Sequence, residues 1–183
     1  MNPLKLRRTL ITIHLWLAGL LAPAFLIVAV SGGLYLAGIK GQTTKTAIEL
    51  PAGTELDFAS PDLEQDIRDI LDAQGLNIDF EYIRGRGNTA MTRPTTRSFV
   101  RFQDTPDGLT AELNKPDLPY TLMELHKGHG PQLYRMYQIA VAIVLLLVVI
   151  GGMAVGLLAR NYRRSTLIAG AVGTLVTIAL ILA

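Results

Sequence analysis

The sequence predicts a helical membrane protein in which a small extramembrane α+β domain connects the first of three transmembrane helices to the second. Three observations support this class. The chain has three long segments without charged side chains, its acidic residues are confined to the middle, and the hydrophobic pattern of that middle part changes from helical spacing to alternation. The length of 183 residues agrees with a single extramembrane domain.

The three charge-free segments are long enough to cross a bilayer. Apart from His14, no charged or histidine side chain occurs in residues 9–39, 136–159 and 165–183. About 20 apolar residues in a helix span a hydrocarbon core of about 30 Å. We therefore predict transmembrane helices over about 12–38, 136–158 and 165–183. Buried helices of a soluble protein would show a polar face, which these segments lack. The first run is also about twice as long as a signal peptide's apolar region.

The charge distribution predicts the orientation. All fifteen acidic residues lie between Glu49 and Glu124, whereas basic residues flank the helices at positions 5–8 and 160–164. Short loops rich in lysine and arginine stay on the cytoplasmic side. The N-terminus and the 160–164 turn are then cytoplasmic, and the C-terminus lies outside. The basic residues lie where membrane topology requires them, so no nucleic-acid surface is predicted.

These observations divide the chain into five segments. They are the N-terminus with the first helix (1–40), an outer linker and domain (41–130), the second helix (131–159), a cytoplasmic turn (160–164) and the third helix (165–183). The chain contains no cysteine. Disulfides, thiolate metal sites and iron–sulfur clusters are therefore excluded, and the outer domain must be held together by packing.

The outer segment predicts one helix followed by three strands. Residues 41–60 resemble an extended linker, and a helix should follow from the N-cap Ser60 to the C-terminal stop at Gly75. Strands are predicted over 76–83, 97–103 and 109–113, with a loop over 85–96. A small antiparallel sheet with one helix on its face fits this order. At about 70 residues such a domain is marginal alone, so we expect it to rest on the membrane surface or on a partner.

Two histidines, His126 and His129, lie close together just before the second apolar run. With Glu124 they form a possible metal-binding triplet on a short loop, which would need a fourth ligand or an open position. Alternatively, His14, His126 and His129 are haem ligands. His14 and the other two belong to opposite membrane faces, so a bis-histidine haem would require a homodimer or another subunit. The third alternative is that all three are interfacial side chains without a cofactor.

Several motifs together resemble the PepSY-associated transmembrane helix family. They are the "HLWLAG" opening of the first helix at His14, the Ser31-Gly32-Gly33 element near its end, the helix-then-strand order of the outer segment, "LHKGHG" at residues 125–130 and the following "LLLVVIGGMAVGL". The resemblance covers most of the chain. It implies a bacterial inner-membrane protein whose PepSY-like domain, residues 41–130, is periplasmic.

The resemblance also implies two functions. Some larger relatives are linked to iron uptake, and some carry b-type haem and reduce siderophore-bound iron. This chain has one PepSY-like unit and three predicted spans, whereas those relatives have four or more. We therefore expect a non-enzymatic accessory or binding protein that contacts membrane lipid and a protein partner or a second copy, without cofactor. The alternative is a haem b subunit of a ferric reductase system.

Other motifs concern packing and surface charge. Gly152 and Gly156 form a Gly-x-x-x-Gly pair on the second helix, and Gly32 and Gly33 would let the first helix pack closely. No charged residue is predicted at mid-membrane depth, which argues against a transporter. Arginines are concentrated at positions 84, 86, 93, 97 and 101. They form either a solvated surface or a site for an anionic partner or lipid headgroups.

Overall fold

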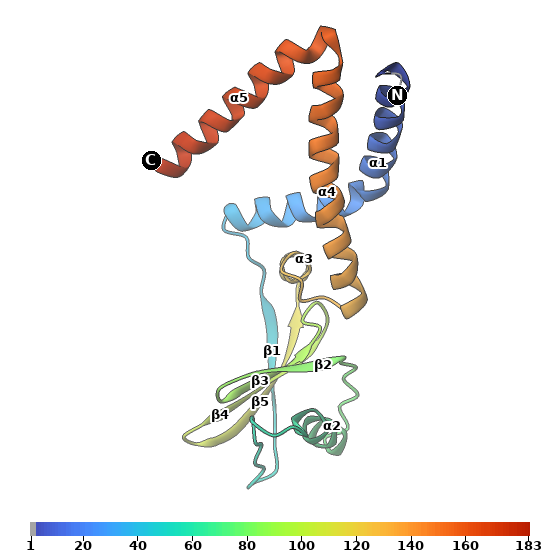
Figure 1. Ribbon diagram of the computed structural model, residues 1–183. Coiled ribbons are helices and arrows are strands. Elements are labelled where there is room, and N and C mark those ends of the chain that lie inside the picture. Colours follow the sequence, from blue (N-terminus) through green and yellow to red (C-terminus); the bar gives the residue numbers. More distant parts are fainter. Residues whose placement is uncertain (1–2) are drawn as a thin grey trace. The chain divides into compact units, whose positions relative to one another are not determined.

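The computed structural model describes residues 3–183, which form five helices and one five-stranded sheet (Figure 1). The elements in chain order are α1 (Pro3–Leu36), β1 (Thr43–Ile48), α2 (Leu63–Ala73), β2 (Tyr82–Arg86), β3 (Thr89–Arg93), β4 (Phe99–Thr105), β5 (Gly108–Pro116), α3 (Leu118–His126), α4 (Gln132–Leu158) and α5 (Arg160–Leu182). They divide into two compact units. The helical unit comprises residues 3–24 and 139–183, and the sheet unit comprises residues 25–138.

Three helices are long and apolar enough to cross a membrane, as the sequence predicts. They cover Lys5–Leu36, Gln132–Leu158 and Arg160–Leu182. The predicted turn over 160–164 is wrong in detail, because its arginines lie in the first two turns of α5. The chain reverses at Ala159 alone, whose backbone is extended. Basic side chains are unfavourable at a helix N-terminus, so helix stability does not explain their position.

The sheet is antiparallel throughout, with the strand order β1-β5-β4-β3-β2. It has five strands where the sequence predicts three. The region interpreted as a linker contains β1, whose threonine-rich residues pair with β5 along its whole length. The predicted loop over 85–96 contains most of a hairpin, in which β2 turns back into β3.

The predicted strand over 76–83 is mostly wrong. Only its last two residues belong to β2, and Leu76–Glu81 has no ladder partner. Its alternation has a different origin, because Leu76, Ile78 and Phe80 pack against the core from an irregular segment. The strands predicted over 97–103 and 109–113 are confirmed as β4 and β5, which are longer or shifted by a few residues.

The core of the sheet unit lies between α2 and one face of the sheet (Figure 1). Leu63, Ile67 and Leu71 form the buried stripe of α2 at helical spacing. They contact a second set of side chains that alternate along the strands, namely Ala90, Val100, Phe102 and Ala111. Burial of one such large side chain stabilises the fold by about 1.5–3 kcal/mol. This packing confirms the predicted helix-on-sheet arrangement.

The ends of α2 agree only partly with the predicted signals. The helix begins at Leu63, and Ser60 is not its N-cap. The Ser60 hydroxyl instead accepts a hydrogen bond of 3.1 Å from the Asp62 amide in the preceding turn. At the other end Gly75 has a φ of +67°, so it adopts the left-handed conformation expected of a helix stop.

In the helical unit, the predicted packing glycines make separate contacts. A Cβ at Gly152 would lie 3.2 Å from His14 Cε1, so Gly152 faces α1. A Cβ at Gly156 would meet Thr166 on α5. Beyond this contact α5 diverges from α4 and buries none of its residues (Figure 1). Gly32 and Gly33 belong to the sheet unit, where a Cβ at Gly32 would lie 3.7 Å from His126 and one at Gly33 would meet nothing within 4 Å.

Candidate functional site

Helix α3 is the element around which the polar contacts of the sheet unit gather, and the sequence does not predict it. Its N-cap is Asp117, one carboxylate oxygen of which accepts a hydrogen bond of 2.8 Å from the Tyr120 amide. The other oxygen accepts one of 2.9 Å from the Gln42 amide, and the Asp117 amide donates to the Gln42 carbonyl at 3.0 Å. One aspartate therefore caps α3 and attaches the connector between α1 and β1 to it.

The connector lies so close to α3 that residue 41 has to be a glycine. Gly41 has a φ of +73°, and a Cβ built there would lie 2.0 Å from the Tyr120 backbone nitrogen. Neither backbone can move aside easily, because both are fixed by the Asp117 hydrogen bonds. The end of α1 is thus joined to the sheet through a backbone contact that excludes any side chain.

Glu124 of α3 is the centre of a buried polar cluster. Only 3% of the Glu124 surface is exposed. One carboxylate oxygen, Oε2, accepts from Thr95 Oγ1 at 2.5 Å and lies 2.8 Å from His129 Nδ1 and 3.5 Å from Arg93 Nη1. The other, Oε1, pairs with Lys127. We call these five residues the Glu124 cluster. It joins the end of β3 and the segment after it to α3 and the loop beyond.

The electrostatics of the cluster favour a charged Glu124. Burial by itself would raise the pKa of the Glu124 carboxyl, but hydrogen bonds from Lys127, Thr95 and His129 outweigh it and lower the pKa below its usual value. Burial also lowers the pKa of the Arg93 guanidinium, an effect that the Glu124 charge opposes. Arg93 is 8% exposed, so the carboxylate compensates a cation that has little access to water.

His129 is held in the cluster from two sides. Its ring bonds Glu124 through Nδ1, its amide donates to the Glu124 carbonyl at 2.9 Å, and its carbonyl accepts from the Thr95 amide at 3.2 Å. Burial lowers the pKa of the His129 imidazole, and the nearby Arg93 charge acts in the same direction, while the hydrogen bond to Glu124 opposes both. The neutral imidazole is favoured, and its Nδ1 proton then points at the carboxylate.

His126 makes a different contact, with Ser31 of α1. The distance from His126 Nδ1 to Ser31 Oγ is 2.8 Å, and Ser31 is 1% exposed. The Ser31 hydroxyl donates its single proton to the Val28 carbonyl at 3.1 Å. With that proton on the Val28 carbonyl, His126 Nδ1 is the donor to Ser31 Oγ, and Nε2 takes no part in this contact.

The beginning of α4 is attached to the same region. The Gln132 amide at the start of the helix donates to Glu81 Oε2 at 2.8 Å, where a carboxylate is favourable at the positive helix end. Gln138 Nε2 donates to the Leu125 carbonyl at 2.5 Å. Gly130 leaves room for Leu125 and Tyr134, because a Cβ there would lie 3.0 and 3.3 Å from their side chains. Helix α3 thus connects the end of α1, the sheet and the beginning of α4.

The five arginines predicted as a possible anion site separate into three environments. Arg93 is buried in the Glu124 cluster, and Arg97 pairs with Asp79 at 2.9 Å. Arg84 and Arg101 both lie next to Met91 in the strand register, on the sheet face opposite α2. Arg86 is two residues from Arg84 on the same face. Part of this face near Phe99 is covered by α3. The Tyr120 ring stacks on the Phe99 ring, with 6.4 Å between the ring centroids.

The part of this face that α3 leaves open is basic. We call it the arginine face, and define it by Arg84, Arg86 and Arg101 with Lys45. Its acidic member, Glu112, already pairs with Lys45 at 3.2 Å. Arg101 lies directly opposite Glu112 in the register, yet its buried Nε has no hydrogen-bond partner among the described residues. The face therefore has positive charge that the described part of the chain does not compensate.

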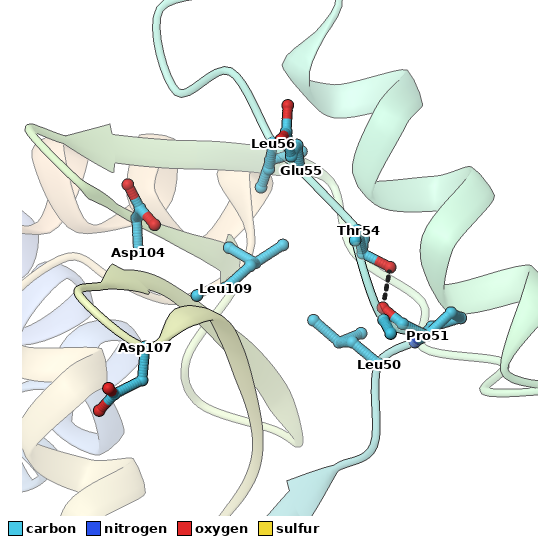
Figure 2. A pocket seen from close by; sticks show the side chains of 11 residues that line it. Leu50, Pro51, Thr54, Glu55, Leu56, Asp104, Asp107 and Leu109 are labelled. Atoms are coloured by element: carbon cyan, nitrogen blue, oxygen red, sulfur yellow. Dashed lines mark hydrogen bonds between the residues drawn. The ribbon is translucent and has the colours of Figure 1, made fainter.

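A cleft of about 590 Å³ lies on the other side of the sheet unit, between residues 50–56 and the turn that joins β4 to β5 (Figure 2). Figure 2 shows Leu50 and Leu109 facing one another across it, with Asp104 and Asp107 at the turn. Leu50, Leu56 and Leu109 also pack against the core. The cleft is thus the open margin of the core, with carboxylates on its rim.

The predicted metal and haem residues are distributed over both units. His14 lies in the helical unit beside Gly152, and His126 and His129 lie in the sheet unit. His126 is the last residue of α3, not part of a loop. Among residues 3–183 no group of three or more histidine, aspartate or glutamate side chains is arranged to hold a metal ion. Glu124 contacts His129, whereas His126 contacts Ser31. The predicted metal triplet stays a prediction, because these contacts bring together only two of its three residues.

Sequence reasoning missed Thr95 and Asp117, and it singled out Ser31 and Arg93 without predicting their contacts. The Ser31–His126 and Thr95–Glu124 partners are 95 and 29 residues apart, so no local spacing indicates them. The available signal was at Asp117, because an aspartate before Leu-Pro is typical of a helix N-cap with proline in the first turn. No protein-family model, no curated protein and no solved structure matches this chain significantly.

Proposed function

We propose that this chain is a membrane-anchored accessory protein of the PepSY type whose sheet unit binds an acidic segment of a partner protein. The arginine face carries the proposal. It is an open face with three arginines, and its acidic residue is already paired with Lys45. Arginine guanidinium groups suit carboxylates because their planar forks bond both oxygens. The proposed role is binding without catalysis, in the bacterial inner membrane with the sheet unit in the periplasm.

The contacts of α3 support a role in a membrane complex. A domain bound only by a flexible linker would hold its partner at no fixed place. Here Asp117, Gly41, the Ser31–His126 hydrogen bond and the Glu81 contact to Gln132 fix the sheet to the adjoining ends of α1 and α4. A partner on the arginine face would therefore be held at a defined position relative to those helix ends.

A binding assay with matched charge changes tests this proposal. The full chain in lipid nanodiscs would be titrated with a fluorescent oligoglutamate peptide, and anisotropy would report binding. We expect Arg86→Glu to weaken binding and Lys115→Glu, an equal charge change at an exposed site outside the face, to have a smaller effect. Equal effects of the two variants would mean that only net charge matters, which would contradict the proposal.

Haem binding is the second candidate, and the anchored imidazoles favour it. Ligating histidines usually donate their other ring N–H to a carboxylate, a backbone carbonyl or water, and a serine hydroxyl can accept in the same way. His126 and His129 both have Nδ1 engaged in this way, with Ser31 and Glu124. Either could present Nε2 to a haem iron, which would supply one-electron chemistry. The second axial ligand would come from another subunit or a second copy.

The absorbance spectrum of the purified protein tests the haem candidate. A haem protein would show a Soret band that His126→Gln or His129→Gln removes. A chain expressed with haem available that stays colourless, while remaining folded and membrane-bound, would contradict the second candidate and leave the first untouched.

A further inference from the structure

The helical unit has an open cavity of about 500 Å³ with mixed chemistry. Its polar lining includes Arg7 of α1 and Tyr162 and Ser165 of α5, and its apolar lining includes Val155 and Ala169. Gly152 and Gly156 line it on α4, where the missing side chains let His14 and Thr166 approach the helix closely. The cavity therefore has a polar part at the ends of two helices and an apolar part along α4.

The charged side chain in this cavity is that of Arg7. Within residues 3–183 the buried Nε of Arg7 makes no hydrogen bond. The hydroxyl of Thr166, which also lines the cavity, donates to the Tyr162 carbonyl at 3.0 Å. It makes no hydrogen bond with Arg7 Nε. The basic residues of the helical unit are at positions 5, 7, 8, 160, 163 and 164, and its sequence contains no aspartate or glutamate. Any countercharge for Arg7 therefore has to come from outside the unit.

A second, smaller cavity of about 220 Å³ continues along α1 and α4. It shares Gly152 and Val155 with the first, and its other walls are Ile11, His14 and Leu15. Its surroundings are mainly apolar and follow the direction of the helices. The two cavities together present a basic end followed by an apolar groove, which is the arrangement of charge and hydrocarbon in an anionic phospholipid.

We propose that this pair of cavities binds one anionic phospholipid, with the headgroup phosphate on Arg7 and an acyl chain in the groove between α1 and α4. The Arg7 guanidinium would donate to a phosphate oxygen, and the Ser165 hydroxyl and Tyr162 phenol would be further donors. The acyl chain would pass Gly152 and contact Val155 and Leu15. This binding is independent of the partner proposed for the arginine face.

The chain offers two matched pairs of variants for a test. Arg7→Gln removes the cavity charge, whereas Arg8→Gln removes an equal charge from an exposed position on the same helix. Gly152→Leu adds a side chain at a position that lines both cavities and contacts His14, whereas Gly151→Leu adds the same side chain where a Cβ meets nothing within 4 Å. Native mass spectrometry of the detergent-solubilised full chain would count bound lipid during titration with phosphatidylglycerol and, separately, with phosphatidylcholine.

We expect phosphatidylglycerol to bind more tightly than phosphatidylcholine. Arg7→Gln should weaken this binding roughly tenfold, as for loss of one charge-assisted hydrogen bond, and Arg8→Gln should not. Gly152→Leu should lower lipid occupancy more than Gly151→Leu. Equal affinity for the two lipids, or equal effects of the two arginine variants, would overturn the proposal. Displacement of the lipid by millimolar inorganic phosphate would also overturn it, because the site would then recognise phosphate alone. Should Gly152→Leu fail to fold, the arginine pair decides.

Discussion

His129 Nδ1 lies 2.8 Å from Glu124 Oε2, the same oxygen that faces the buried guanidinium of Arg93 at 3.5 Å. The histidine that the sequence marks as a possible ligand is therefore part of the structure that keeps a charged pair stable inside the sheet unit. This relationship leads to predictions about stability, pH and the attachment of the sheet to the helix ends.

Removing the carboxylate should destabilise the sheet unit strongly. In Glu124→Gln the Arg93 guanidinium stays buried without its countercharge, which typically costs about 3–5 kcal/mol. The melting temperature of the full chain in detergent measures the effect. Glu112→Gln is the control, because its pair with Lys45 is exposed and should contribute at most about 1 kcal/mol. Similar melting temperatures for the two variants would contradict a structural role for Glu124.

Acid should destabilise the protein in two steps. The folded-state pKa of His129 is below its usual 6.5, so protonation favours the unfolded chain, and stability should fall as pH falls through and below 6.5. The pKa of Glu124 is likewise lowered from 4.5, so a further loss should follow below that pH. Melting curves between pH 7.5 and about 3 measure both steps. His129→Gln should remove the first step only, and an unchanged first step would show that another group causes it.

Gly41→Ala should disrupt the attachment of the connector to α3. The new Cβ would be strained by the positive φ and would also collide with the Tyr120 backbone. Gly53→Ala separates these causes, because Gly53 has a φ of +80° but nothing within 4 Å of its Cβ position. We expect a cost of about 1–2 kcal/mol for the strain alone in Gly53→Ala, and a clearly larger one for Gly41→Ala. Limited proteolysis of the sheet unit compares the two, and equal susceptibility would refute the close approach.

The Ser31–His126 hydrogen bond should show energetic coupling. A double-mutant cycle of Ser31→Ala and His126→Ala, measured by thermal unfolding in detergent, should give a coupling of about 1 kcal/mol, the usual contribution of such a bond. A cycle of Ser31→Ala with His129→Ala is the comparison, since His129 bonds Glu124 and not Ser31. A coupling of zero in the first cycle would mean that the two side chains do not interact in the folded protein.

The proposed orientation can be tested cleanly because the chain contains no cysteine. Single cysteines at Ala73 in α2 and at Asn161 in the first turn of α5 would each be the only reactive thiol. A membrane-impermeant maleimide applied to intact cells should label Ala73→Cys, and it should label Asn161→Cys only after permeabilisation. The opposite pattern would reverse the orientation and place the sheet unit in the cytoplasm.

The accuracy of the sequence predictions differs between elements for physical reasons. The helix α2 and the strands β4 and β5 were predicted because apolar residues recur along each of them at the spacing of its own secondary structure. The edge strand β1 was missed, since it is held mainly by backbone pairing to β5 and has little apolar alternation. The segment 76–81 was wrongly predicted as a strand. Three of its alternating side chains pack against the core, but none of its residues has a ladder partner. Helix α3 was missed because most of its contacts come from distant parts of the chain.

The sequence by itself determined that the chain has three membrane-length helices and a helix-on-sheet domain between the first two. Hydrophobicity is a property of each segment alone, so no partner is needed to recognise it. Only the tertiary structure decided the role of the histidines. Whether an imidazole faces a carboxylate, a serine or open space depends on residues up to 95 positions away. Such pairings arise from the packing of α3 against α1 and the sheet, which local patterns do not encode.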